Sequence, residues 1–345
     1  MVSKLKPVVV LTLLTLCCPA SARSGELPSN HLRRDMPARL VELTANVDVT
    51  NKTSTPITRY VFRVTAPPTL DSQLVKTSSS TAERTRRREH KNETDSYLEM
   101  EFPVPEKKSS KHRVTFSVLV MPVDYLQGKR SASEPDHKEL DRYLQPSALI
   151  ESDSPEVQKV SRSLFRRRQT PEATAKTAYE FPARVLRFKV QDGNLGARKA
   201  LQTRVGDCTE FACLFAALCR TQQIPARRIN VFNFGKNQSI SAKQPNHHIA
   251  EIHLKDVGWM PVDPNLGGGR YDRDIGFGKL GNTIVILNRE GSWVWSSWLP
   301  PNGFSKSLPK PRTSYGISWT GRIVAEGPVD SLFEQFQSID SVDSN

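Results

Sequence analysis

The residues best suited to chemistry lie in the stretch VGDCTEFACLFAALCR, which covers positions 205–220. A polar run changes there into an apolar block, and Cys208 stands at the change. A helix that begins at Cys208 would carry a continuous apolar face and be buried nearly all round. The unpaired N–H groups and the dipole at a helix start favour a thiolate. Cys208 is therefore a candidate nucleophile, and a packing role is the alternative.

The number and spacing of the cysteines argue against a zinc site and against a disulfide framework. The chain has five, of which Cys17 and Cys18 fall in the first 22 residues, and the others are Cys208, Cys213 and Cys219. The last three lack the paired CxxC spacing of a zinc site and are not the even, dispersed set of a disulfide-stapled protein. We therefore expect no metal and no other cofactor. Cys213 and Cys219 lie inside the predicted helix, which favours packing roles.

A thiolate needs a base, and the base needs a group that orients it. The segment NHHIAEIHL, 246–254, is joined by the short turn KDVG to WMPVDPN, 259–265. Two strands joined this tightly pair in an antiparallel manner, which folds Asp263 back toward 248–250. Successive side chains of a strand point to opposite faces, so His247 and His248 diverge. These residues alone do not decide which histidine is the base.

The first 22 residues have the pattern of a secretory signal peptide. Two lysines precede an apolar run, and the small residues Ala20-Ser21-Ala22 follow it. The apolar run is shorter than the ~20 residues that span a bilayer. We expect cleavage after Ala22 and an exported protein, periplasmic or extracellular, with no transmembrane segment after signal removal.

The charge of the chain bears on its partners. The formal net charge is +13, and the basic runs are not interleaved with aromatic residues that could stack on bases. We therefore expect no nucleic-acid partner. A basic exported protein can attract anionic envelope polymers through its long-range field, with simple solubility as the alternative.

The first part of the chain favours strands. Short segments in which apolar and polar residues alternate occur between about positions 38 and 125, separated by turn-rich or charged stretches. This pattern is typical of a small Ig-like β-sandwich, which we assign to residues 23–125. The charged stretch 77–95 is expected to be a long loop or hairpin tip within it.

After residue 125 the alternating strand pattern ends and helical signals follow. Residues 126–142 are polar and break the periodicity, which is typical of a linker. Two Ser/Thr-Pro pairs, Ser154-Pro155 and Thr170-Pro171, then predict helix starts. A mixed core is expected over 143–328, with a polar tail at 329–345.

The ordered motifs GDCTEFACLFAALCRTQQIPAR and HHIAEIHLKDVGWMPVDP resemble the transglutaminase-like superfamily, and in particular its exported bacterial members with an N-terminal β-sandwich. The resemblance covers about residues 143–265 well and the flanks loosely. It implies an α+β fold in which a papain/transglutaminase-like core is preceded by a small all-β sandwich.

The same resemblance implies the roles of individual residues. Cys208 matches the nucleophile and Asp263 the orienting aspartate. The histidine of the family precedes a strand glutamate by four residues, so Glu251 selects His247 as the base. Two departures stand out: Gln223 replaces a glycine at the helix end, which should alter the C-cap, and Ile249 replaces an aromatic residue beside the histidine.

The activity implied by the resemblance is thiol-dependent acyl transfer on a protein or peptide amide bond, completed by water or by an amine. One alternative is an inactive protein of the same fold that binds or scaffolds. A second alternative is a polysaccharide-binding module that uses Trp293 and Trp295, which share one face of a predicted strand.

Overall fold

The computed structural model describes residues 27, 31–89, 95–127, 137–165, 169–267, 276–289, 294–298 and 312–342. The predicted signal peptide, 1–22, and Trp293 lie outside these ranges. Within the described ranges, no helix combines the length and the apolar character needed to cross a membrane.

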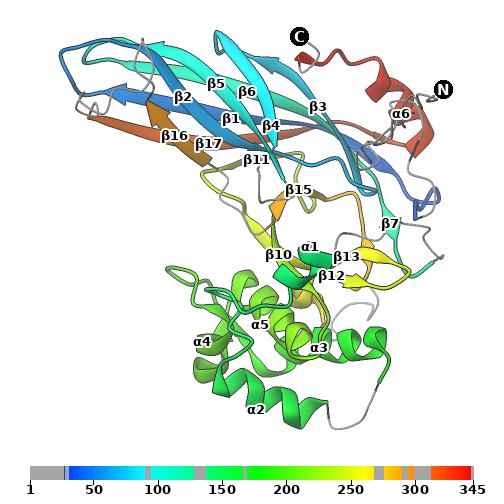
Figure 1. The fold of residues 1–345 in the computed structure, drawn as a ribbon. Helices are drawn as coiled ribbons and strands as arrows, with labels where there is room; N and C mark the ends of the chain where they lie inside the picture. Colours follow the sequence, from blue (N-terminus) through cyan, green and yellow to red (C-terminus); the bar gives the residue numbers. More distant parts are fainter. Residues whose placement is uncertain are drawn as a thin grey trace, which may run out of the picture.

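Two antiparallel sheets form a sandwich, at the top of Figure 1. The first sheet has the order β11 (Ser239–Ala242), β17 (Thr313–Gly327), β1 (Ala38–Asn51), β6 (Ser109–Val120) and β3 (Gln73–Ser80). The second has the order β16 (Val294–Trp298), β2 (Ile57–Ala66), β5 (Ser96–Val104) and β4 (Arg84–Glu89). In β1, buried and half-buried residues alternate along most of its 14 residues, because successive side chains point to opposite faces. Its buried face packs into the apolar layer between the sheets.

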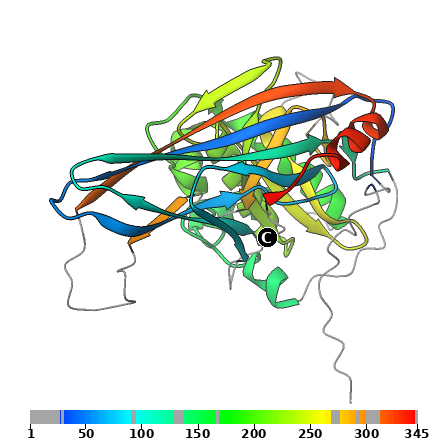
Figure 2. The same ribbon diagram turned by 90° about the horizontal axis from the view of Figure 1, so that it is seen from above.

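The sandwich contains strands from the end of the chain, which differs from the expected division at 143–328. β17 pairs with β1 along its whole length, and β16 pairs with β2. Even β11, from the middle of the expected core, joins the edge of β17. The long β17 is visible beside β1 in both views (Figures 1 and 2). Pairing between segments this far apart in sequence depends on tertiary structure, so a division drawn by position missed it.

Three shorter assignments are also corrected. The stretch 77–95, expected to be a long loop or hairpin tip, contains the end of β3 and all of β4, which pairs in an antiparallel manner with β5, the next strand. The expected linker 126–142 ends in helix α1 (His137–Arg142). The expected polar tail 329–345 begins with helix α6 (Val329–Gln337), which buries Leu332 and Phe336 against the end of the sandwich. Its apolar residues recur three to four positions apart, a signal hidden by its polar composition.

The second body, at the bottom of Figure 1, combines helices with a small sheet. The sheet has the order β13 (Gly258–Val262), β12 (His247–Leu254), β10 (Ala226–Asn233) and β15 (Ile284–Arg289). The helices are α2 (Pro155–Leu164), α3 (Pro171–Val185), α4 (Gly196–Thr203) and α5 (Cys208–Thr221). Short elements complete it: β8 (Arg187–Phe188) with β9 (Val205–Gly206), β7 (Val123–Asp124) with β14 (Lys279–Leu280), and the 3₁₀ turn η1 (Pro264–Leu266).

The central sheet is shared by two apolar cores. In β10, Val231 packs into the core around α5, whereas its neighbour Phe232 packs into the core of the sandwich. In β15, Ile286 and Leu287 divide in the same way. The period of two along a strand therefore places one face of β10 and β15 on the helices and the other on the sandwich.

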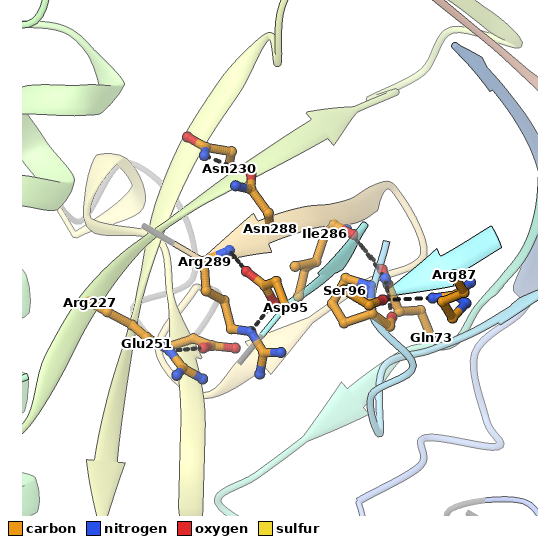
Figure 3. Close-up of polar contacts among 11 residues, drawn as sticks. Gln73, Arg87, Asp95, Ser96, Arg227, Asn230, Glu251, Ile286, Asn288 and Arg289 are labelled. Carbon is orange, nitrogen blue, oxygen red and sulfur yellow. Dashed lines mark hydrogen bonds and ion pairs between the residues drawn. The ribbon is translucent and has the colours of Figure 1, made fainter. Parts of the chain in front are cut away.

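Polar side chains fix β15, the edge strand of the central sheet, to the sandwich (Figure 3). The Gln73 amide accepts from the backbone N–H of Ile286 at 2.8 Å and donates to its carbonyl at 2.9 Å. The Asp95 carboxylate accepts from the backbone N–H of Arg289 at 2.5 Å and from its Nε at 2.7 Å. These contacts satisfy buried backbone groups that an edge strand would otherwise leave unpaired.

The two predicted Ser/Thr-Pro helix starts are confirmed. The Ser154 hydroxyl accepts from the backbone N–H of Val157, and the Thr170 hydroxyl accepts from that of Ala173. Helix α5 ends at Thr221, with Gln222 as its C-cap. The next residue, Gln223, has a φ of 58°, the left-handed conformation that favours glycine. The departure noted in the sequence therefore lies directly after the helix C-cap.

Replacing Gln223 by glycine is expected to raise the free energy of unfolding by about 1 kcal/mol, because a side chain at a left-handed position costs about this much. Chemical denaturation gives the value. The Gln223→Ala variant is the matched control, since it keeps Cβ and should show no comparable gain. Equal stability of the glycine and alanine variants would contradict the explanation.

Candidate active site

The first turn of α5 is held by a capping box. The Asp207 carboxylate accepts from the backbone N–H of Thr209 at 3.0 Å, and the Glu210 carboxylate accepts from the backbone N–H of Asp207 at 2.9 Å. Glu210 is fully buried, and this burial raises the pKa of its carboxyl group. No acceptor for the backbone N–H of Cys208 is found among the described residues. Cys208 is thus half-buried in the first turn, with a free N–H beside its thiol.

The β12–β13 hairpin brings the histidine and the aspartate together. Ala250 pairs with Val262, so Asp263 continues the register opposite Ile249 and is diagonal to His247 on the same face. The His247 Nε2 lies 2.8 Å from the Asp263 Oδ2.

The Asp263 carboxylate has further contacts that fix its position. Its Oδ1 accepts from the backbone N–H of Asn265 at 3.2 Å and from the Asn265 side-chain amide at 3.1 Å. The backbone N–H of Asp263 donates to the Gly276 carbonyl at 2.6 Å. Asp263 is therefore held on both sides, with Oδ2 directed at the imidazole.

His247 connects the aspartate to the thiol. Its Nε2 hydrogen-bonds to Asp263, and its ring is close enough to Cys208 for the thiol to act on its charge. Burial of the ring opposes protonation, but the interactions with Asp263 and Cys208 outweigh it and raise the pKa of His247 to about 10. The imidazolium therefore persists at neutral pH, where it can stabilise a thiolate on Cys208.

His248 also contacts the nucleophile, from the other side of β12. Its Nδ1 lies 3.5 Å from the Cys208 Sγ and 3.2 Å from the Thr209 Oγ1. Burial, with added repulsion from Arg228 and His247, lowers the pKa of His248 to about 3. The two neighbouring histidines thus differ in charge at neutral pH: His247 is protonated and His248 is neutral.

A buried ion pair supports the strand that carries both histidines. The Arg227 Nε on β10 lies 2.8 Å from the Glu251 Oε2 on β12, and both side chains are almost completely buried (Figure 3). The Arg227 guanidinium also covers the Trp259 ring on β13, 3.7 Å from its centroid. These contacts join β10 to both strands of the hairpin.

The structure brings all three predicted residues together, and of the two histidines only His247 contacts Asp263 in the part of the chain that the structure describes. Sequence reasoning did not foresee that His248 reaches Cys208, because alternation along a strand separates neighbouring side chains. It also missed Glu210, although the spacing Asp207-x-x-Glu210 is the signature of a capping box. The catalytic roles of Cys208, His247 and Asp263 stay a prediction.

The structure also bears on a metal site and on the two other cysteines of α5. Among the described residues, no group of three or more His, Cys, Asp or Glu side chains could hold a metal ion. Cys213 and Cys219 are fully buried and unbridged. Burial raises the pKa of the Cys219 thiol far above its usual range.

Comparisons with known proteins agree with this architecture. Residues 158–264, which contain α5 and both strands of the hairpin, match the profile of the transglutaminase-like superfamily. A search of curated protein sequences found no significant match. Among solved structures, a proposed cysteine protease from Cytophaga hutchinsonii is similar, with a TM-score of 0.56 and 15% identity, over 84% of this chain and 91% of that chain. The periplasmic domain of TgpA from Pseudomonas aeruginosa matches with a TM-score of 0.34 and 19% identity, over 64% and 69%.

Residues 158–264 form a transglutaminase-like domain, as the family match shows. The expected α+β fold, with a transglutaminase-like core and a sheet-rich N-terminal region, is confirmed. This domain match supports a thiol-dependent activity in general.

The opposite pKa shifts of the two histidines can be measured by NMR. We expect the His247 ring to remain protonated until the pH rises to about 10 and the His248 ring to remain neutral until the pH falls to about 3. Histidine-labelled protein is titrated, and the variants His247→Gln and His248→Gln assign the signals. Titration of both rings near 6.5 would contradict the charge assignment.

The same shifts set the pH dependence of stability. The pKa of His247 is raised above 6.5, so its contribution is complete below about pH 6.5 and is lost as the pH rises through about 10. The pKa of His248 is lowered, so its contribution is present above about pH 6.5 and is lost as the pH falls toward about 3. His247→Gln should therefore flatten the alkaline side of the curve, with a smaller change on the acid side because His248 loses the repulsion of His247.

Proposed function

We propose that this protein is a cysteine acyltransferase, peptidase or amidase that acts on protein or peptide amide bonds through Cys208, His247 and Asp263. The observation that carries the proposal is the position of His247, whose Nε2 lies 2.8 Å from the Asp263 Oδ2 and whose ring is close enough to Cys208 for the thiol to contribute to its raised pKa. This is the relation that a nucleophile, a base and an orienting carboxylate require.

The first half of the reaction forms a thioester. The Cys208 thiolate attacks the carbonyl carbon, and the carbonyl oxygen becomes an oxyanion beside the free backbone N–H of Cys208. The C–N bond then breaks as the His247 imidazolium gives its proton to the leaving nitrogen. Asp263 keeps the imidazole in one orientation and stabilises its charged form before this transfer.

The second half releases the acyl group. The neutral His247 takes a proton from the acceptor, which attacks the thioester carbon, and the thiolate of Cys208 leaves. Water as the acceptor gives hydrolysis, and an amine gives a new amide and hence a cross-link. The two reactions use the same residues and differ in the mass of the product.

The place of action is proposed from the sequence. The signal-peptide pattern at residues 1–22 supports an exported protein, and the net charge of +13 supports association with anionic envelope polymers.

Alkylation tests the reactive thiolate without a substrate. At pH 6 we expect iodoacetamide to modify Cys208 about tenfold faster than free cysteine, because a helix start and a neighbouring imidazolium make a cysteine more reactive. His247→Gln should remove this advantage, whereas Cys213→Ala, a buried cysteine of the same helix, should leave the rate unchanged. A rate no greater than that of the free thiol would contradict an active triad and favour the inactive, scaffolding alternative.

Mass spectrometry of peptides incubated with the protein and a primary amine tests the transfer itself. We expect an added water or an added amine in the wild-type products, and loss of both in Cys208→Ala. Asp263→Asn should lower the rate by roughly 10²- to 10⁴-fold, because the histidine loses its orienting charge. Asp256→Asn, an exposed aspartate of the same hairpin, is the matched control and should keep full activity.

A further inference from the structure

An extended segment runs alongside the residues that lead into Cys208. β8 is parallel to β9, which is followed directly by Asp207 and the nucleophile. The backbone N–H groups of Arg187 and Lys189 each donate at 2.9 Å to carbonyls at Arg204 and Gly206. The short strand β8 and the residues 189–191 that follow it therefore run beside the segment that leads into Cys208.

The outward edge of this strand is unpaired. Because backbone groups alternate in direction along a strand, the N–H groups of Phe188 and Val190 point away from β9. No acceptor for either group is found in the part of the chain that the structure describes. Edges of this kind pair with extended polypeptides in proteins that bind peptides by strand addition.

The same segment carries an exposed apolar surface. The side chains of Phe188, Val190 and Leu195 are 58%, 75% and 37% exposed. They account for three of the seven large hydrophobic residues exposed in the described ranges, within eight consecutive positions. Single exposed apolar residues are ordinary, but such a concentration at one place marks a binding surface.

This surface adjoins the nucleophile and is fixed relative to it. The Phe188 ring lies 6.2 Å, between centroids, from the ring of Phe211, one turn after Cys208 in α5. The backbone N–H of Gln191 donates to Asp207 at 3.0 Å, and that of Leu195 donates to Glu210 at 2.8 Å. The carboxylates that cap α5 therefore also hold the apolar segment.

We propose that residues 187–195 form the substrate-docking edge of the enzyme, which pairs with an extended polypeptide and receives its apolar side chains. This inference rests on the proposed function and names its substrate class: unfolded or flexible polypeptide with an apolar residue beside the reacting amide. Continuity with Cys208 favours the substrate as the occupant over a second copy of the chain.

The test measures binding separately from chemistry. The Cys208→Ala variant is titrated against fluorescein-labelled dimethylated casein, an unfolded apolar polypeptide, and against folded ubiquitin. We expect saturable binding of casein only. Phe188→Ser or Val190→Thr, added to Cys208→Ala, should weaken it about tenfold through lost apolar contact. Val324→Thr, an exposed valine on β17, is the matched control and should bind as the parent variant does.

A proline substitution tests whether the backbone N–H of Val190 contributes to casein binding. Val190→Pro removes the outward N–H of residue 190 and leaves the inward bonds of Lys189 and Gln191 in place. We expect it to weaken casein binding more than Val190→Ala does. The same substitutions in the wild-type background should leave the alkylation rate of Cys208 unchanged, which shows that the variants fold and that the triad is intact.

Three results would overturn the docking edge: no casein binding by Cys208→Ala, equal binding by all variants, or a dimer in solution that Phe188→Ser converts to a monomer. None of these results tests the triad of Cys208, His247 and Asp263. The triad is tested separately by the alkylation rate of Cys208, which is measured without any peptide. Slow alkylation with normal casein binding would instead contradict the proposed function alone.

Discussion

Two carboxylates, those of Asp207 and Glu210, hold the first turn of α5, and the arrangement around the nucleophile depends on them. They cap the helix by accepting backbone hydrogen bonds, which leaves the N–H of Cys208 free. They also accept from the backbone of Gln191 and Leu195 in the segment beside the site. One polar cluster thus positions both the thiol and the exposed apolar edge, so their relative geometry does not depend on a flexible loop.

The opposite wall of the site depends on burial of β12. This strand carries two histidines with opposite charge states, because Asp263 and Cys208 outweigh the effect of burial on His247, whereas burial and Arg228 act in the same direction on His248. The strand is held by the buried pair of Arg227 and Glu251. In the same sheet, β10 and β15 are covered by helices on one face and by the sandwich on the other. The sandwich therefore supports the half of the sheet next to β12, and the contacts of Gln73 and Asp95 hold β15 against it.

Local signals in the sequence predicted local structure well. The helix starts at Ser154 and Thr170 and the β12–β13 hairpin follow from short-range rules of capping and alternation. The C-terminal elements did not follow from such rules. β17 pairs with β1 across most of the chain, and the partner of a strand is not written in its own residues. Burial of α6 depends in the same way on a surface formed by distant strands.

For the candidate site, the sequence by itself determined the residue types, their order and the start of the helix at Cys208, because capping and amphipathic periodicity act over a few residues. Only the tertiary structure decided which of two adjacent histidines meets Asp263, and that the other also reaches the thiol. Tertiary structure alone also placed Phe188 opposite Gly206, two residues before the nucleophile, and near Phe211 of the same helix. The physical reason is the same in each case: the direction of a side chain and its electrostatic surroundings are set by groups from other elements.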